Sequence, residues 1–125
     1  VKVWESPYAS KACTPVVYQD HVYWAWRRVH CLDFATGVQK WEGGDFGDAG
    51  SCIVTADGKL IVWGGSGRLS LVETTAASPD AYRELARTVR IFSTTAWPHV
   101  VLAGGRLYCK DRDGNLKCFQ LRPPK

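Results

Sequence analysis

The chain has 125 residues, of which 46% are hydrophobic and 22% charged, and its formal net charge is +4. This composition is typical of a globular protein, so it argues against a disordered chain, and the scattered basic residues argue against a nucleic-acid-binding surface. No run of about 18 apolar residues occurs, so the sequence predicts no membrane-spanning helix.

Three segments align with one another and predict an internal repeat. They begin near Pro15, Cys52 and His99, and the equivalent valines, Val17, Val54 and Val101, are 37 and 47 residues apart. A period of this size is typical of β-propeller blades, each of which is a four-stranded antiparallel sheet. We therefore expect an all-β fold, with the whole of residues 1–125 forming one three-blade unit.

In chain order, the sequence predicts an outer strand and then three blades. The blades are expected to consist of short strands joined by tight turns, because Gly-containing pairs such as Asp57-Gly58 and Gly104-Gly105 separate the apolar runs. The predicted segments are the outer strand at 1–6, the first blade at 14–46, the second blade at 51–93 and the third blade at 98–121.

The outer strands of the first two blades are predicted at 38–43 and 88–93, and the third repeat stops before such a strand. Ahead of 88–93 lies an insertion, TTAASPDAYRELART, in which Ser78 precedes a proline at a favourable first helical position. Tyr82 and the Leu85-Ala86 pair would share one face of a helix. The insertion is therefore predicted to form a helix of one to two turns.

The predicted strands are apolar on both faces. In the strand from His21 to Trp26, for example, Trp24 lies on one face and Tyr23 on the other. A sheet that is apolar on both sides must be covered on both sides. Blades stacked face to face would provide that cover.

Three blades are too few to close a ring. We therefore expect the chain to self-associate, most simply as a dimer with six blades. The strand at 1–6, with Val1, Val3 and Trp4, would complete the last blade of the other copy, with Trp4 as the counterpart of Trp41.

One motif is specific enough to suggest a family. Residues 33–41 read DFATGVQKW, in which Asp33, Thr36, Gly37 and Trp41 form the pattern D-x-x-T-G-x-x-x-W. Asp33 and Thr36 can cap a turn, Gly37 can take its strained corner, and Trp41 can dock between blades. The pattern resembles the tryptophan-docking motif of PQQ-like (quinoprotein-type) β-propeller repeats.

The wider chain, from about Ala12 to Leu121, is similar to the C-terminal part of PQQ-binding-like propeller proteins of planctomycete-type bacteria, relatives of an outer-membrane assembly lipoprotein. Segments that carry the similarity include CTPVVYQDHVYW, HCLDFATGVQKW and LAGGRLYCKDRDGNLKCF. Only the first repeat keeps the full motif, and Arg27-Arg28 replaces the usual glycine-bearing turn. The resemblance implies an extracytoplasmic location, periplasmic or secreted.

No catalytic residue, cofactor or metal site is predicted. A quinoprotein dehydrogenase would need adjacent cysteines, and the five cysteines include neither an adjacent pair nor a CxxC. They are expected to be buried reduced thiols, with one disulfide or a metal site as alternatives. The run from Asp111 to Asn115 superficially suggests a calcium loop, but it lies where the repeat requires a hairpin turn.

The sequence therefore favours a non-enzymatic scaffold or protein-interaction module that self-associates to close a ring. The alternative is a fragment of a PQQ-dependent dehydrogenase, which binding of PQQ with calcium would reveal. A third possibility is that assembly of the ring is itself the function.

Overall fold

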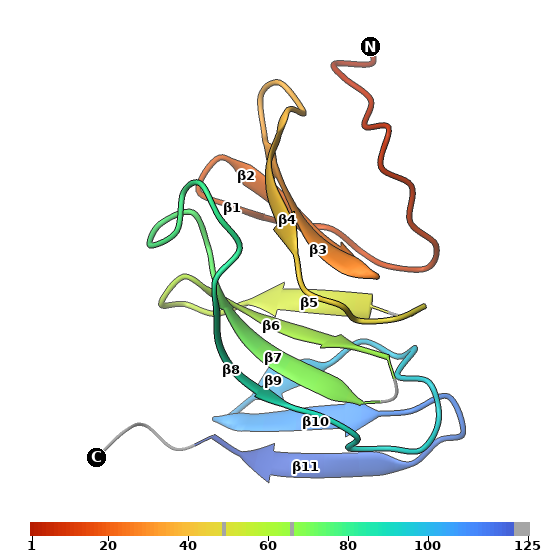
Figure 1. Cartoon of the computed structure of the whole chain (residues 1–125). Coiled ribbons are helices and arrows are strands. Elements are labelled where there is room, and N and C mark those ends of the chain that lie inside the picture. The colour runs from red at the N-terminus through yellow and green to blue at the C-terminus, as the bar shows by residue number, and fades with distance from the viewer. Residues whose placement is uncertain (49, 66, 122–125) are drawn as a thin grey trace.

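The structure is a computed structural model that describes residues 1–48, 50–65 and 67–121. In these residues the fold is all-β: eleven strands form antiparallel sheets of four, four and three strands (Figure 1). The strands are β1 Val16–Tyr18, β2 His21–Trp26, β3 Arg28–Asp33, β4 Gln39–Gly43, β5 Gly50–Val54, β6 Lys59–Gly64, β7 Arg68–Glu73, β8 Glu84–Thr88, β9 Val101–Ala103, β10 Arg106–Lys110 and β11 Leu116–Gln120.

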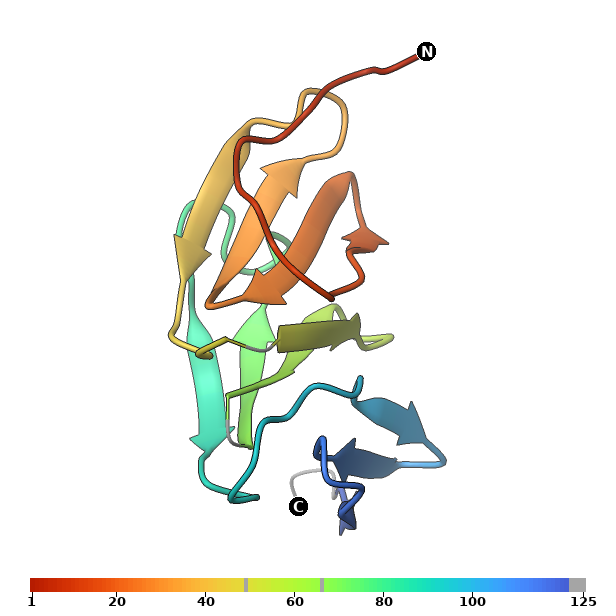
Figure 2. The ribbon, with the colours of Figure 1, turned by 90° about the vertical axis from the view of Figure 1, so that its right-hand side faces the viewer.

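The three sheets follow one another along the chain and stack face to face (Figures 1 and 2). The strand orders are β1-β2-β3-β4, β5-β6-β7-β8 and β11-β10-β9, so each sheet is a simple meander. The N-terminal segment runs beside the first sheet, at one end of the stack, and β11 lies at the other end. This arrangement confirms the predicted blade-like sheets, and the stack is open.

Tight turns join the strands, and their backbone angles explain the turn residues. The β9–β10 hairpin turns on Gly104 and Gly105, with φ of 57° and 72°. Two consecutive positive φ angles match the right-handed twist of the flanking strands, and glycine adopts them without steric strain. The β1–β2 hairpin has the same geometry at Gln19 and Asp20, with φ of 44° and 62°.

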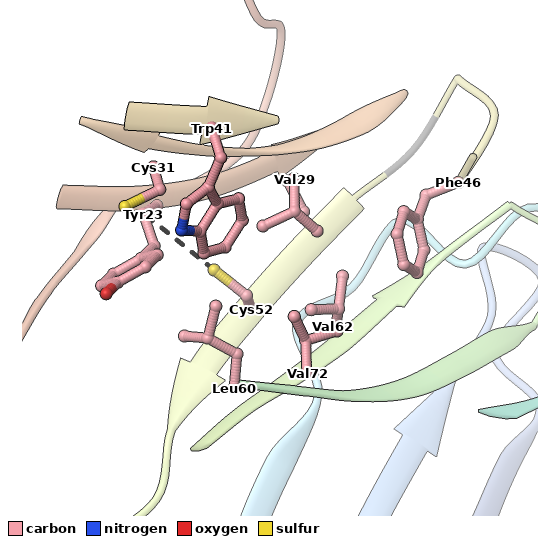
Figure 3. Close-up of a cluster of buried hydrophobic side chains, with 10 residues drawn as sticks. Tyr23, Val29, Cys31, Trp41, Phe46, Cys52, Leu60, Val62 and Val72 are labelled. Atoms are coloured by element: carbon pink, nitrogen blue, oxygen red, sulfur yellow. Dashed lines mark hydrogen bonds between the residues drawn. The ribbon is translucent and has the colours of Figure 1, made fainter. Parts of the chain in front are cut away.

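The first and second sheets share one hydrophobic core. The first sheet contributes Tyr23 and Trp41, and Phe46 in the following linker packs with them against β5, β6 and β7 (Figure 3). Strands β2 and β5 approach so closely that a Cβ on Gly50 would lie 2.1 Å from the Ala25 carbonyl oxygen. Glycine at position 50 therefore sets the spacing between the two sheets.

The second and third sheets share another core. Leu60 and Val62 face the first sheet, whereas Ile61 and Trp63 face the third, and all four side chains are buried. Both faces of the second sheet are thus covered, as the two-sided apolar pattern predicts. On the other side of the second core lie residues of the linker and of the third sheet: Ile91, Phe92, Ala96, Val100, Leu107 and Cys109.

The predicted helix in the insertion is wrong, because the described residues contain no helix. Residues 74–78 instead form a turn, closed by a hydrogen bond from the Ser78 N–H to the Thr74 carbonyl at 2.9 Å. After residues 79–83 the chain forms β8 (Glu84–Thr88). The outer strand of the second sheet therefore lies earlier in the sequence than the predicted 88–93. A two-turn helix is marginal by itself, and pairing with the open edge of β7 satisfies more backbone groups.

The outer strand predicted at 1–6, which would complete the blade of a second copy, is not formed within the single chain. Val1–Ser6 form no strand, and they lie along the first sheet rather than beside the third (Figure 2). Among the described residues the third sheet has three strands, so its completion by the N-terminal segment of a second copy stays a prediction. A strand needs a paired neighbour, and within one chain residues 1–6 do not reach β11.

In the described part of the chain, no helix is long and apolar enough to cross a membrane.

Candidate functional site

The motif turn between β3 and β4 is held by its own side chains. Asp33 Oδ1 accepts hydrogen bonds from the Ala35 N–H at 3.0 Å, the Thr36 N–H at 2.9 Å and the Thr36 hydroxyl at 3.0 Å. These bonds, chiefly the one from the Thr36 backbone, lower the pKa of Asp33. Gly37 closes the turn with φ of 73°, a conformation that favours glycine.

Trp41 docks between the first and second sheets. Its side chain is 5% exposed, and its Nε1–H donates to the Ser78 carbonyl at 3.1 Å. The Tyr82 ring packs edge-on against it at 6.0 Å and the Tyr23 ring is tilted at 5.9 Å (Figure 3 shows Trp41 with Tyr23). Trp41 therefore attaches the outer strand of the first sheet to the turn of the next.

Trp4 makes the equivalent contact at the preceding position. Its Nε1–H donates to the Phe34 carbonyl at 2.8 Å, and its ring lies so close to Gly37 that a Cβ there would be 2.6 Å away. Trp4 and Trp41 are 37 residues apart, the same spacing as Val17 and Val54. The contact between the N-terminal segment and the first sheet thus resembles the contact that β4, the outer strand of the first sheet, makes with the second sheet.

The outward face of the third sheet is exposed, and it mixes apolar side chains with the polar ones of Arg106, Lys110 and Gln120. Val101, Tyr108 and Cys118 lie opposite one another across its strands, and residues directly opposite share a face. Val101 is 52% exposed, and Leu116, on the same face opposite Lys110, is 62% exposed. By the repeat alignment, Cys118 corresponds to Cys31, which is fully buried against the second sheet.

The outer edge of β11 is unpaired among the described residues, because β11 is the terminal strand of its sheet. Two hollows lie beside it. One, of about 790 Å³, lies between residues 90–93 and 115–117. The other, of about 490 Å³, lies between β7 and β8 of the second sheet and Leu107 of β10, and Leu121, which follows β11, borders it. In the first two sheets, a fourth strand occupies the corresponding edge.

The cysteines divide by burial. Burial raises the pKa of Cys31 to about 11, of Cys52 to about 12 and of Cys109 to about 11, so these thiols stay protonated at neutral pH. None of the five cysteines forms a disulfide, and Cys118 is the exposed one. The structure therefore places the most accessible thiol on the open face of the third sheet.

The Asp111 side chain, in the run that suggests a calcium loop, is engaged in hydrogen bonds within the fold. Asp111 Oδ1 accepts from the backbone N–H groups of Asp113 and Asn115, and Oδ2 accepts from the Thr94 hydroxyl and the Asn115 amide. Its oxygens thus hold the β10–β11 turn. The described residues contain no group of three or more His, Cys, Asp or Glu side chains arranged to hold a metal ion.

The chain matches no family model and no curated protein. The sequence singled out Asp33, Thr36, Gly37 and Trp41; the structure places the first three in one turn, beside Trp4, and places Trp41 apart from them, against Ser78 and Tyr82. It also singled out Val1, Val3 and Trp4, of which Trp4 docks and the two valines are exposed. Sequence reasoning did not name Leu116 as a residue of the outward face of the third sheet, although its equivalence to the buried Val29 of the first repeat was a usable signal.

Proposed function

We propose that this chain is a non-enzymatic PQQ-like β-propeller module, a scaffold for protein interaction, that self-associates to close a ring. Two copies, each with three blades, would give a six-bladed ring. The blade loops around such a ring would be its surface for other proteins.

The observation that carries this proposal is the exposed face of the third sheet. Leu116 and Cys118 occupy positions that face another sheet in the first two repeats, and Val101 pairs with Tyr108 as the inward-facing Val16 pairs with Tyr23. Apolar side chains grouped on an exposed face mark an interaction site, and the basic side chains of Arg106 and Lys110 border them here. A further blade would cover it in the way the second sheet covers the first.

The complementary surface is on the first sheet. Val22, Trp24 and Leu32 form its outward face, and the repeat aligns them with side chains through which the second sheet packs on the first. In the single chain, Trp4 and Cys13 pack against this face. A second copy could therefore repeat, between the two chains, the packing seen within each chain. In a two-fold dimer this contact occurs twice and closes the ring.

The mass in solution tests this proposal. Static light scattering of the 125-residue chain, over a tenfold range of concentration, should give a species of twice 13.9 kDa. Leu116→Glu places a charge within the proposed contact and should give a monomer. Leu85→Glu is the matched control, because Leu85 is 40% exposed in β8 and lies outside the proposed contact. A monomeric parent chain would overturn the proposal, and so would a dimer that Leu116→Glu leaves unchanged.

A further inference from the structure

We infer that residues 1–6 of one copy pair with β11 of a second copy, in the same register in which β4 pairs with β3. This inference rests on the proposed self-association and names the segment that enters the vacant strand position. The third sheet would thereby gain a fourth strand like those of the first two.

The strand position beside β11 has a partly formed site for an occupant. The second hollow is floored by Leu69 and Leu71 of β7 and Ala86 of β8, and Leu121 borders it. These apolar side chains belong to the second sheet and face the third, so an outer strand on β11 would cover them. Backbone N–H and C=O groups on the free edge of β11 would be paired at the same time.

The occupant is indicated by the place of Trp4. In the first repeat, Trp41 lies on the outer strand β4, and its indole docks on the turn of the next sheet through the Ser78 carbonyl. Trp4 already makes the docking contact, through Phe34, but its own segment has no strand partner. The partner that would restore the pattern is the edge strand of a preceding blade, and β11 of a second copy is such an edge.

The repeat fixes the register. Within the first sheet, β3 pairs with β4 through Val29 and Gly43, His30 and Glu42, and Cys31 and Trp41. Transferred to the contact between copies, these pairs become Leu116 with Ser6, Lys117 with Glu5, and Cys118 with Trp4.

This register sets Lys117 opposite Glu5, and opposite charges favour a cross-strand pair; on pairing, Glu5 would exchange its partner Lys2, and Lys117 the Ile91 carbonyl, for each other. A shift of one residue would set Lys117 opposite Trp4 or Ser6. It would also move the Trp4 side chain to the other face of the sheet and away from the Gly37 turn. The side chains therefore favour this register over the two that differ from it by one residue.

Disulfide trapping tests the register. In a chain that also carries Cys13→Ser and Cys118→Ser, the pair Ser6→Cys and Leu116→Cys should form a covalent dimer when oxidised glutathione is added. Paired residues on antiparallel strands have Cα atoms about 4.5–5.5 Å apart, which a disulfide can span. Within one chain the N-terminal segment and β11 lie at opposite ends of the stack, so an intramolecular bond is excluded (Figure 1).

The matched control replaces Ser6→Cys with Glu5→Cys, which moves the thiol by one residue. At least a tenfold lower yield of covalent dimer is expected from this control, because its side chain points to the other face. Light scattering on the reduced variants separates the two proposals. A non-covalent dimer without register-specific trapping overturns the strand pairing alone, whereas a monomer overturns self-association and the pairing with it.

Hydrogen exchange on the unmodified chain provides a second readout that needs no folded variant. Amides in residues 2–6 and 116–120 should exchange at least tenfold more slowly at high protein concentration than after dilution to monomer. If assembly protects the amides of β10 while those of residues 2–6 still exchange as in the monomer, the two copies pack face to face without exchanging a strand. That result contradicts the inference.

Discussion

Removing the Trp41 side chain should cost a large part of the stability of the fold. A tryptophan buries about 150–250 Å², which at about 25 cal/mol per Å² corresponds to about 4–6 kcal/mol. Trp41 is 5% exposed and packs between two aromatic rings, so Trp41→Ala should lower the free energy of unfolding by about 3–5 kcal/mol. Domains of this size are stable by about 5–15 kcal/mol, so the variant should be marginally folded.

The assay is urea unfolding followed by far-ultraviolet circular dichroism, at one fixed protein concentration because association adds to stability. Trp41→Phe keeps a ring but loses the N–H that donates to Ser78, so it should cost about 1–2 kcal/mol. Trp4→Ala, measured at a concentration where the chain is monomeric, should cost less than about 2 kcal/mol because Trp4 is only partly buried. Equal losses for Trp41→Ala and Trp4→Ala would refute the assigned docking of Trp41.

Three further predictions concern single residues. Gly37→Ala should lower the free energy of unfolding by about 1–2 kcal/mol because of the positive φ, and by more because the new Cβ would clash with Trp4. Gly114→Ala introduces a similar backbone strain, but no other atom lies near its Cβ. The urea midpoint should therefore fall further for Gly37→Ala than for Gly114→Ala. Burial alone would raise the pKa of Asp111, but hydrogen bonds from its turn lower it from 3.8 to about 2. Its contribution to stability should thus be complete above about pH 4 and lost as the pH falls towards 2, and Asp111→Asn should flatten that part of a plot of urea midpoint against pH. Iodoacetamide should label Cys118 first in the dilute chain, and the rate should fall at least tenfold as the copies associate; a rate independent of concentration would place Cys118 outside the contact.

The repeat and the hairpins could be predicted from the sequence because short-range chemistry specifies them. Glycine pairs such as Gly104-Gly105 fix tight turns between apolar runs, and both runs and turns recur at the same place in each repeat. The D-x-x-T-G turn is similarly local, since Asp33 and Thr36 bond to backbone groups within three residues. Local patterns of this kind are sufficient to predict strands, turns and the stacking of two-sided apolar sheets.

The insertion could not be predicted from its own residues. Ser78 and the residues after it carry a helix-start signal, but the edge of β7 offers backbone partners from outside the segment. Arg68 also holds the new strand, with its guanidinium 2.8 Å from the Glu84 carboxylate. Tyr82 then packs on Trp41 rather than on a helical neighbour. Tertiary contacts therefore overrode local propensity.

Only part of the candidate site could be predicted from the sequence, for a similar reason. Sequence alone identified Trp4 as the counterpart of Trp41, but it could not show that Trp4 docks on Gly37 of its own chain. The exposed face around Leu116 becomes visible only when the burial of equivalent positions is compared. Its composition alone resembles that of any internal blade.

Small-angle X-ray scattering tests the closed ring most directly, because shape and mass are measured together. A compact chain of 125 residues should have a radius of gyration of about 14 Å, and a compact pair of chains about 18 Å. We predict a value of about 18–20 Å with twice the chain mass at all concentrations above the dissociation constant. A radius near 14 Å at the mass of one chain, or a long particle with an open end, would contradict ring closure.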